Sequence, residues 1–139
     1  MPKHPQSLVG IFLLLLSCLV SQAATFTVDI NKGTPSIKET LNHANANDTV
    51  FVAPGIYQEH TIIIEKPITL IGVDFPVLDA NNEKVEILII SSNNVYVSGF
   101  IFRNVSVSYM NDLAALKVKR VKYGSIVNNK FENCFFGIY

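Results

Sequence analysis

Residues of the same chemical class recur along this chain at fixed intervals, and this recurrence restricts the possible folds more than any other property. A shift of 29 residues carries Ile87, Ile89, Val97, Phe102 and Asn104 onto Leu116, Val118, Ile126, Phe131 and Asn133. A shift of 27 carries Ile62, Ile68, Leu70 and Gly72 onto Ile89, Val95, Val97 and Gly99, and a shift of 22 carries Leu116 onto Ile138. Short apolar segments that alternate at period two and repeat in this way are typical of a coil that stacks on itself.

The repeat therefore predicts an all-β fold, a parallel β-helix in which equivalent residues of successive coils lie one above another. Asn133 should stack on Asn104, because amides can hydrogen-bond along the axis and Asn tolerates left-handed backbone. We expect the extra residues of the 29-residue coil to form a loop within residues 104–115. The positions predicted to serve turns and ladders are Gly55, Gly72, Gly99, Asn104, Asn128 and Asn133.

A short helix should precede the coils. Two overlapping start signals are present, Thr34 followed by Pro35, and Ser36 followed three residues later by Glu39. Ile37, Leu41 and Ala44 fall on one face, which predicts an amphipathic helix running to about residue 46. Such a helix would cap the first coil.

The N-terminal segment has the layout of an export signal. Lys3 precedes an apolar run over residues 8–20, and small residues lead to Ala23, so residues 1–23 are predicted to be a cleaved signal peptide and residues 24–139 the β-helix domain. The apolar run is shorter than the roughly 20 residues that span a bilayer. An alternative is lipid attachment at Cys18, because residues 15–18 are similar to a bacterial lipobox.

Composition excludes several classes of protein. The 11 basic and 11 acidic residues cancel and 49% of residues are hydrophobic, which argues against a disordered chain and against nucleic acid as a partner. Removal of the signal would leave Cys134 as the single cysteine, so no internal disulfide is expected. We interpret Cys134 as a small buried hydrophobe.

Four segments of the chain carry a family likeness: DTVFVAPGIYQE at 48–59, EKPITLIG at 65–72, PVLDA at 76–80 and VSGFIFRN at 97–104. Together they resemble the opening coils of NosD-type periplasmic proteins, which help to mature nitrous-oxide reductase. The resemblance implies a right-handed parallel β-helix of the pectin-lyase type. It also implies a periplasmic location and work beside an ABC transporter in assembling the copper-sulfur centre of the reductase. Because the chain stops at Tyr139 within an expected strand, we expect further coils beyond it.

No catalytic or metal constellation is visible in the sequence. Asp74 and Asp79 are the one close carboxylate pair on a single coil, and we read them as solvated turn residues. His43, His60 and Met110 lack further ligands at metal-binding spacing, so copper is suggested by the resemblance alone and no cofactor is detectable. The sequence therefore favours a protein that is not an enzyme.

One surface is a candidate for docking. The run from Lys117 to Lys122 carries four cations. We expect the equivalent outward positions one coil earlier to be Leu88 and Ile90, so that a basic strip and an apolar strip lie side by side. The residues of this predicted partner surface are Leu88, Ile90, Lys117, Lys119, Arg120 and Lys122. A solvated face that blocks edge association is the alternative.

The sequence thus predicts a non-catalytic periplasmic scaffold that assists copper-enzyme maturation, with nitrous-oxide reductase and an ABC transporter as the partners implied by the resemblance. The alternative is a β-helix that binds or cleaves a polysaccharide in a lateral groove.

Overall fold

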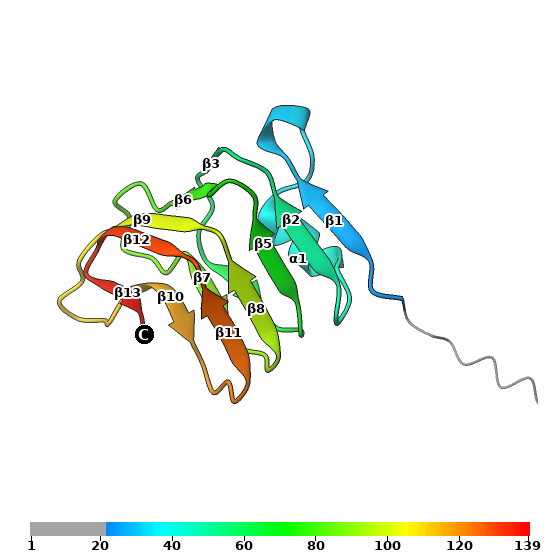
Figure 1. The fold of residues 1–139 in the computed structure, drawn as a ribbon. Coiled ribbons are helices and arrows are strands. Elements are labelled where there is room, and N and C mark those ends of the chain that lie inside the picture. The colour runs from blue at the N-terminus through cyan, green and yellow to red at the C-terminus, as the bar shows by residue number, and fades with distance from the viewer. Residues whose placement is uncertain (1–21) are drawn as a thin grey trace, which may run out of the picture.

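The computed structural model describes residues 22–139, which form a solenoid of about four turns built from parallel sheets, with one short helix at its beginning (Figure 1). The predicted fold class is confirmed. Apart from Gln22 and Ala23, the expected export segment, with Cys18, lies outside the described residues.

From β2 on, each of the four coils contributes one strand to each of three parallel sheets, and β1 adds a fifth strand to the first of them. Sheet A contains β1 (Thr25–Val28), β2 (Thr49–Val52), β5 (Thr69–Gly72), β8 (Val95–Ser98) and β11 (Gly124–Val127). Sheet B contains β3 (Ile56–Tyr57), β6 (Val77–Asp79), β9 (Ile101–Val105) and β12 (Lys130–Cys134). Sheet C contains β4 (Ile62–Ile64), β7 (Leu88–Ile90), β10 (Ala114–Val118) and β13 (Phe136–Ile138).

The core consists of apolar columns along the solenoid axis. Val97 lies in register with Ile126, as predicted, and Leu70 precedes them in the same column of sheet A. In sheet B, Phe102 pairs with Phe131, and their rings stack with centroids 5.3 Å apart. Since burial of apolar area is the main favourable term in folding, these columns hold the coils together.

Sheet C departs from the expected register by one residue. Leu88, not Ile87 or Ile89, lies between Ile62 and Leu116. The reason is the number of residues between sheet C and the equivalent positions Ile68, Val95 and Gly124 at the start of the sheet A strands. Three residues (65–67), four (91–94) and five (119–123) precede these positions in successive coils. Each added residue moves the preceding strand by one position relative to sheet A, and in a strand one position exchanges the two faces.

The helix α1 (Ile37–His43) begins at the second of the two predicted start signals. Ser36 is its N-cap and accepts a hydrogen bond from Glu39 N at 3.1 Å, whereas the Thr34 hydroxyl accepts one from Asp29 N and supports the turn around the 3-10 helix η1 (Ile30–Lys32). The helix ends earlier than expected because Ala44 takes up extended backbone.

Two side chains from the following coil hold α1 at its ends. The carboxylate of Glu59 accepts hydrogen bonds from Ile37 N at 2.9 Å and Lys38 N at 3.0 Å. At the other end, Lys66 Nζ donates to the carbonyl oxygens of Asn42 and Ala44. An anion at the N-terminus and a cation at the C-terminus both complement the helix dipole. With Ile37 and Leu41 buried, α1 covers the beginning of the solenoid.

The predicted loop follows β9 and covers residues 106–113, where Tyr109 and Met110 are 97% and 92% exposed. Within residues 22–139, no helix is long and apolar enough to cross a membrane.

Candidate functional site

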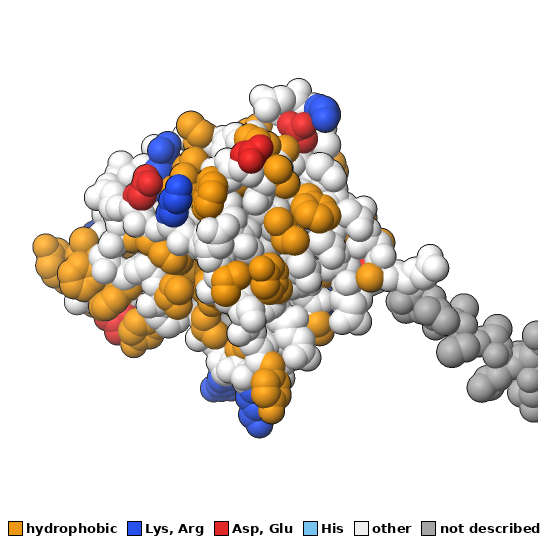
Figure 2. All heavy atoms as spheres, viewed as in Figure 1, with side chains coloured by type: hydrophobic (Ala, Val, Ile, Leu, Met, Phe, Trp, Pro, Cys, Tyr) orange, Lys and Arg blue, Asp and Glu red, His pale blue; other side chains and the backbone are white. Residues whose placement is uncertain are grey.

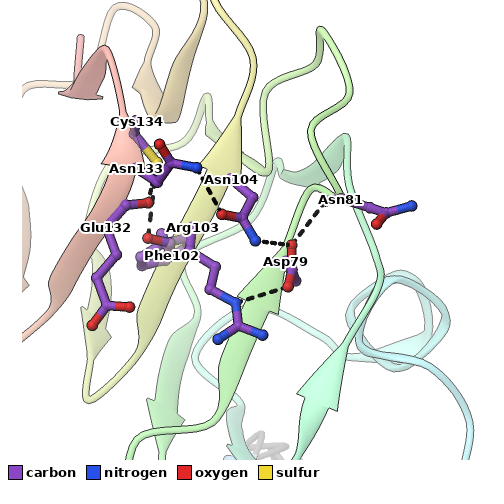
Figure 3. Close-up of polar contacts among 8 residues, drawn as sticks. All are labelled: Asp79, Asn81, Phe102, Arg103, Asn104, Glu132, Asn133 and Cys134. Carbon is purple, nitrogen blue, oxygen red and sulfur yellow. Dashed lines mark hydrogen bonds and ion pairs between the residues drawn. The ribbon is translucent and has the colours of Figure 1, made fainter.

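A polar ladder lies where sheet B turns towards sheet C, and Asp79 is at its base (Figure 3). Asp79 Oδ1 accepts hydrogen bonds from Asn81 N at 2.8 Å and from Asn104 Nδ2 at 2.9 Å. Asp79 Oδ2 lies 2.7 Å from Arg103 Nε, and Arg103 is the residue in register with Asp79 on the next coil. The carboxylate is buried, and both of its oxygens have partners.

Burial by itself raises the pKa of Asp79, but the hydrogen bonds from Asn81 N, Asn104 and Arg103, together with the Arg103 charge, outweigh it and leave this pKa below its ordinary value. A general acid needs a raised pKa and access to substrate. Asp79 has neither. Its carboxylate instead links its own coil to Arg103 and Asn104 of the next coil. Asp79 is not a solvated turn residue, as the sequence suggested, because Arg103 and Asn104 lie over it.

Asn104 extends the ladder to the next coil, as predicted. Asn133 Nδ2 donates to Asn104 Oδ1 at 3.0 Å, and both residues have left-handed backbone, with φ of 51° and 60°. Asn128 also has left-handed backbone (φ 53°), and its carbonyl oxygen accepts a hydrogen bond from Gly99 N. The predicted stacking of amides is therefore confirmed.

At the three predicted glycine positions, neighbouring atoms leave too little space for a side chain. A Cβ added to Gly72 or to Gly99 would lie less than 3.0 Å from the carbonyl oxygen of the other residue, and Gly99 alone of the three has a positive φ, of 84°. Gly55, predicted to serve a turn, has no positive φ; a Cβ there would meet Ile30 Cγ2 at 2.9 Å.

The predicted partner surface is not assembled as expected. Leu88 and Ile90 are 0% and 2% exposed, because the shorter turn after β7 places them on the inner face of sheet C. Lys117 is half-buried, and its Nζ lies 2.9 Å from Glu86 Oε1, so its charge is already paired. The prediction of an exposed apolar strip is therefore wrong. Of the predicted basic strip, only the cations of one turn remain unpaired among the described residues.

Those three cations, Lys119, Arg120 and Lys122, lie in the exposed turn between β10 and β11. They form no ion pair within the described part of the chain. We call residues 119–123 the basic turn.

The outer side of sheet A carries no charge, and we call it the neutral face. Outward positions of its five strands lie in two columns along the axis. The first column is Thr25, Thr49, Thr69, Tyr96 and Ser125, and the second is Thr27, Phe51, Ile71, Ser98 and Val127. Seven of the ten side chains carry a hydroxyl group and three are apolar. In Figure 2 the centre of the visible face is correspondingly free of blue and red.

Exposed apolar side chains border the neutral face where sheet A turns into sheet B. Ile30, Ile56 and Val73 are 50%, 52% and 41% exposed. Phe75 follows in the same turn, with the Lys130 ammonium 4.1 Å from its ring centroid. Surfaces that are poor in charge and rich in exposed apolar groups are frequent sites of macromolecular contact.

No protein family, curated protein or solved structure matches this chain.

The remaining candidate ligands do not converge. Within residues 22–139 there is no group of three or more His, Cys, Asp or Glu residues that could hold a metal ion. His43 is exposed on α1, and His60 Nε2 lies 3.4 Å from Glu83. Cys134 is half-buried against the core, and this burial raises the pKa of its thiol, which disfavours a reactive thiolate.

Several structurally important polar residues were not predicted. No local sequence pattern marks the roles of Arg103, Glu59 and Lys66, because each forms its hydrogen bond with a residue more than 20 positions away in the chain. Asn129 was also missed: its side chain accepts from Phe100 N at 3.0 Å and donates to Val97 O at 3.1 Å, replacing backbone bonds at a bend. For Arg103 one sequence signal was available: a shift of 24 residues relates β6 to β9 in sheet B, and this shift relates Asp79 to Arg103.

Proposed function

We propose that this chain is an exported, non-catalytic scaffold that binds another macromolecule through its neutral face. The observation that carries the proposal is the absence of charge at all ten outward positions of sheet A. Charged residues are depleted at the centres of protein interfaces, and aromatic residues are enriched there. Tyr96 lies near the middle of the face and is 37% exposed, and exposed apolar groups border the face on one side.

The architecture supports such a role. The neutral face is a regular sheet whose inward side chains, such as Leu70 and Val97, are fully buried. A surface held by a packed core loses little conformational freedom on binding, which favours affinity. The resemblance to NosD-type proteins supplies the biological setting, assistance in loading the copper-sulfur centre of nitrous-oxide reductase beside an ABC transporter in the periplasm.

Loss of the gene should leave nitrous-oxide reductase exported but without the absorbance of its copper-sulfur centre. Complementation with Ile71→Lys or Tyr96→Lys, which place a charge within the neutral face, should fail to restore the absorbance. Ile63→Lys is the matched control, because Ile63 is 42% exposed on the outer side of sheet C. A fully loaded reductase in the deletion strain would refute the maturation role.

The neutral face also favours a second candidate, the binding of a neutral polysaccharide. Hydroxyl groups recur along the first column at the spacing of neighbouring strands, about 4.8 Å, and Tyr96 offers a ring on which a sugar can stack. No cation is present on the face to pair with uronic acids. Retardation during electrophoresis through neutral glucan gels, lost in Tyr96→Ala, would support this candidate; retardation by uronic-acid polymers alone would oppose it.

A further inference from the structure

We propose that the basic turn is a contact site for the anionic headgroups of a membrane surface. The turn carries three exposed cations, Lys119, Arg120 and Lys122, and Tyr123, which follows Lys122, is 70% exposed. Cations at this density attract anionic lipid, and the amphipathic ring of Tyr is suited to the level of the headgroups. The proposal does not depend on the neutral face or on copper-enzyme maturation.

The turn is held in a fixed shape by the coil below it. Asn93 Oδ1 accepts a hydrogen bond from Lys122 N at 2.8 Å, and Lys119 N donates to Ile90 O at 2.8 Å. Asn94 N donates to the carbonyl oxygen of Tyr123, and Val121 packs against the core. The charged side chains are therefore presented outward by a backbone that is already ordered, which reduces the entropy lost on binding.

The turn has one residue more than the turn of the preceding coil, residues 91–94, and Arg120 adopts left-handed backbone, with φ of 54°. Blue side chains gather at the lower end of the molecule in Figure 2, where Figure 1 places the end of β10 and the start of β11. Neither this turn nor the one below it contains an acidic residue. The positive charge is thus concentrated on an exposed turn.

The shape favours a lipid surface over an acidic protein. A protein interface of standard size needs about 800 Å² on each partner, with an apolar centre, whereas here Tyr123 is the single large exposed apolar side chain of the turn. A small projecting turn can, in contrast, contact an extended anionic lipid surface. Three cations should together strengthen binding roughly 100-fold, since each contributes about fivefold near an anionic leaflet.

The test is sedimentation of the purified protein with vesicles of phosphatidylcholine alone and of phosphatidylcholine with one-third phosphatidylglycerol. We expect binding only to the anionic vesicles, and its loss at high salt because screening weakens the attraction. The variant Lys119→Gln/Arg120→Asn/Lys122→Gln should bind roughly 100-fold more weakly. Asn at position 120 is chosen because it tolerates left-handed backbone.

The matched control, Lys38→Gln/Lys84→Gln/Lys130→Gln, removes the same charge from exposed lysines elsewhere and should bind nearly as tightly as the parent protein. Tyr123→Ser should weaken binding and Tyr123→Trp should preserve it. Equal loss in both triple variants would mean that only net charge matters and would overturn the site. Binding to soluble polyglutamate without binding to anionic vesicles would overturn it in favour of an acidic protein partner.

Discussion

Arg103 lies one coil above Asp79, with its Nε 2.7 Å from Asp79 Oδ2, and this is the shortest ion pair among the described residues. The pair joins two coils at the outer edge of sheet B, where Asn104 adds a second link to the same carboxylate. In this solenoid, polar contacts at the corners therefore supplement the apolar columns within.

Asp79→Ala should lower the free energy of unfolding by about 3 kcal/mol, because it leaves Arg103 half-buried without its partner and removes the acceptor for Asn81 N and Asn104. Asp74→Asn is the control, since Asp74 is exposed on the same coil and Asn tolerates its left-handed backbone, with φ of 52°. Urea unfolding followed by circular dichroism measures both. Equal stability of the two variants would show that the pair contributes nothing.

The same pair predicts how stability depends on pH. The pKa of Asp79 is lowered in the folded protein, so its contribution is complete above the unfolded-state value of 3.8 and is lost as pH falls through the lower folded value. The stability difference between the parent protein and Asp79→Asn should therefore be constant from pH 7 to 5 and shrink below pH 4. A difference that persists unchanged to pH 2 would contradict this assignment.

Asn104 offers a way to separate hydrogen bonding from backbone conformation. Asn104→Gly keeps access to the left-handed region but removes the bonds to Asp79 and Asn133, which should cost about 2 kcal/mol. Asn104→Ala should cost roughly 1 kcal/mol more, because Ala is also strained at this φ. Thermal unfolding of the two variants side by side provides the measurement. If Gly and Ala are equivalent, the left-handed backbone is not retained in solution.

The close approach of Gly72 and Gly99 predicts that neither position accepts a side chain. Gly99→Ala should lower stability by about 3 kcal/mol, because the methyl group meets the Gly72 carbonyl and the φ of 84° is unfavourable for Ala. Gly124→Ala is the control, since its nearest neighbours would lie at 3.4 Å. Denaturant midpoints of the two variants should differ clearly, and similar midpoints would mean that the coils can separate at this corner.

The two side chains that hold α1 should act as a pair. Glu59→Gln and Lys66→Met should each lower stability by about 1 kcal/mol, because each removes a charge that complements one end of the helix. Glu65→Gln, on the exposed residue next to Lys66, should be neutral. Hydrogen exchange should report faster opening of the Thr40 and Ala44 amides, which are bonded within the helix and at its end. Unchanged protection would show that burial of Ile37 and Leu41 alone fixes the helix.

The amino-acid sequence by itself determined the solenoid, the capping helix and the asparagine ladder. Each depends on a signal that is local or strictly periodic: alternation of apolar residues, the Ser36 to Glu39 spacing, and the recurrence of Asn104 as Asn133. Such signals can be recognised in the sequence because stacked coils present the same environment at the same position of every coil.

Only the tertiary structure decided which way Leu88 and Ile90 face and which partners the charged residues find. The three, four and five residues that precede equivalent positions of sheet A in successive coils shift sheet C relative to sheet A one position at a time, and a single position exchanges the inside with the outside. Lys117 is neutralised by Glu86, which is 31 residues away, and Asp79 by Arg103, which is 24 residues away. These contacts depend on the exact length of every intervening turn, and that length is not encoded in any local pattern.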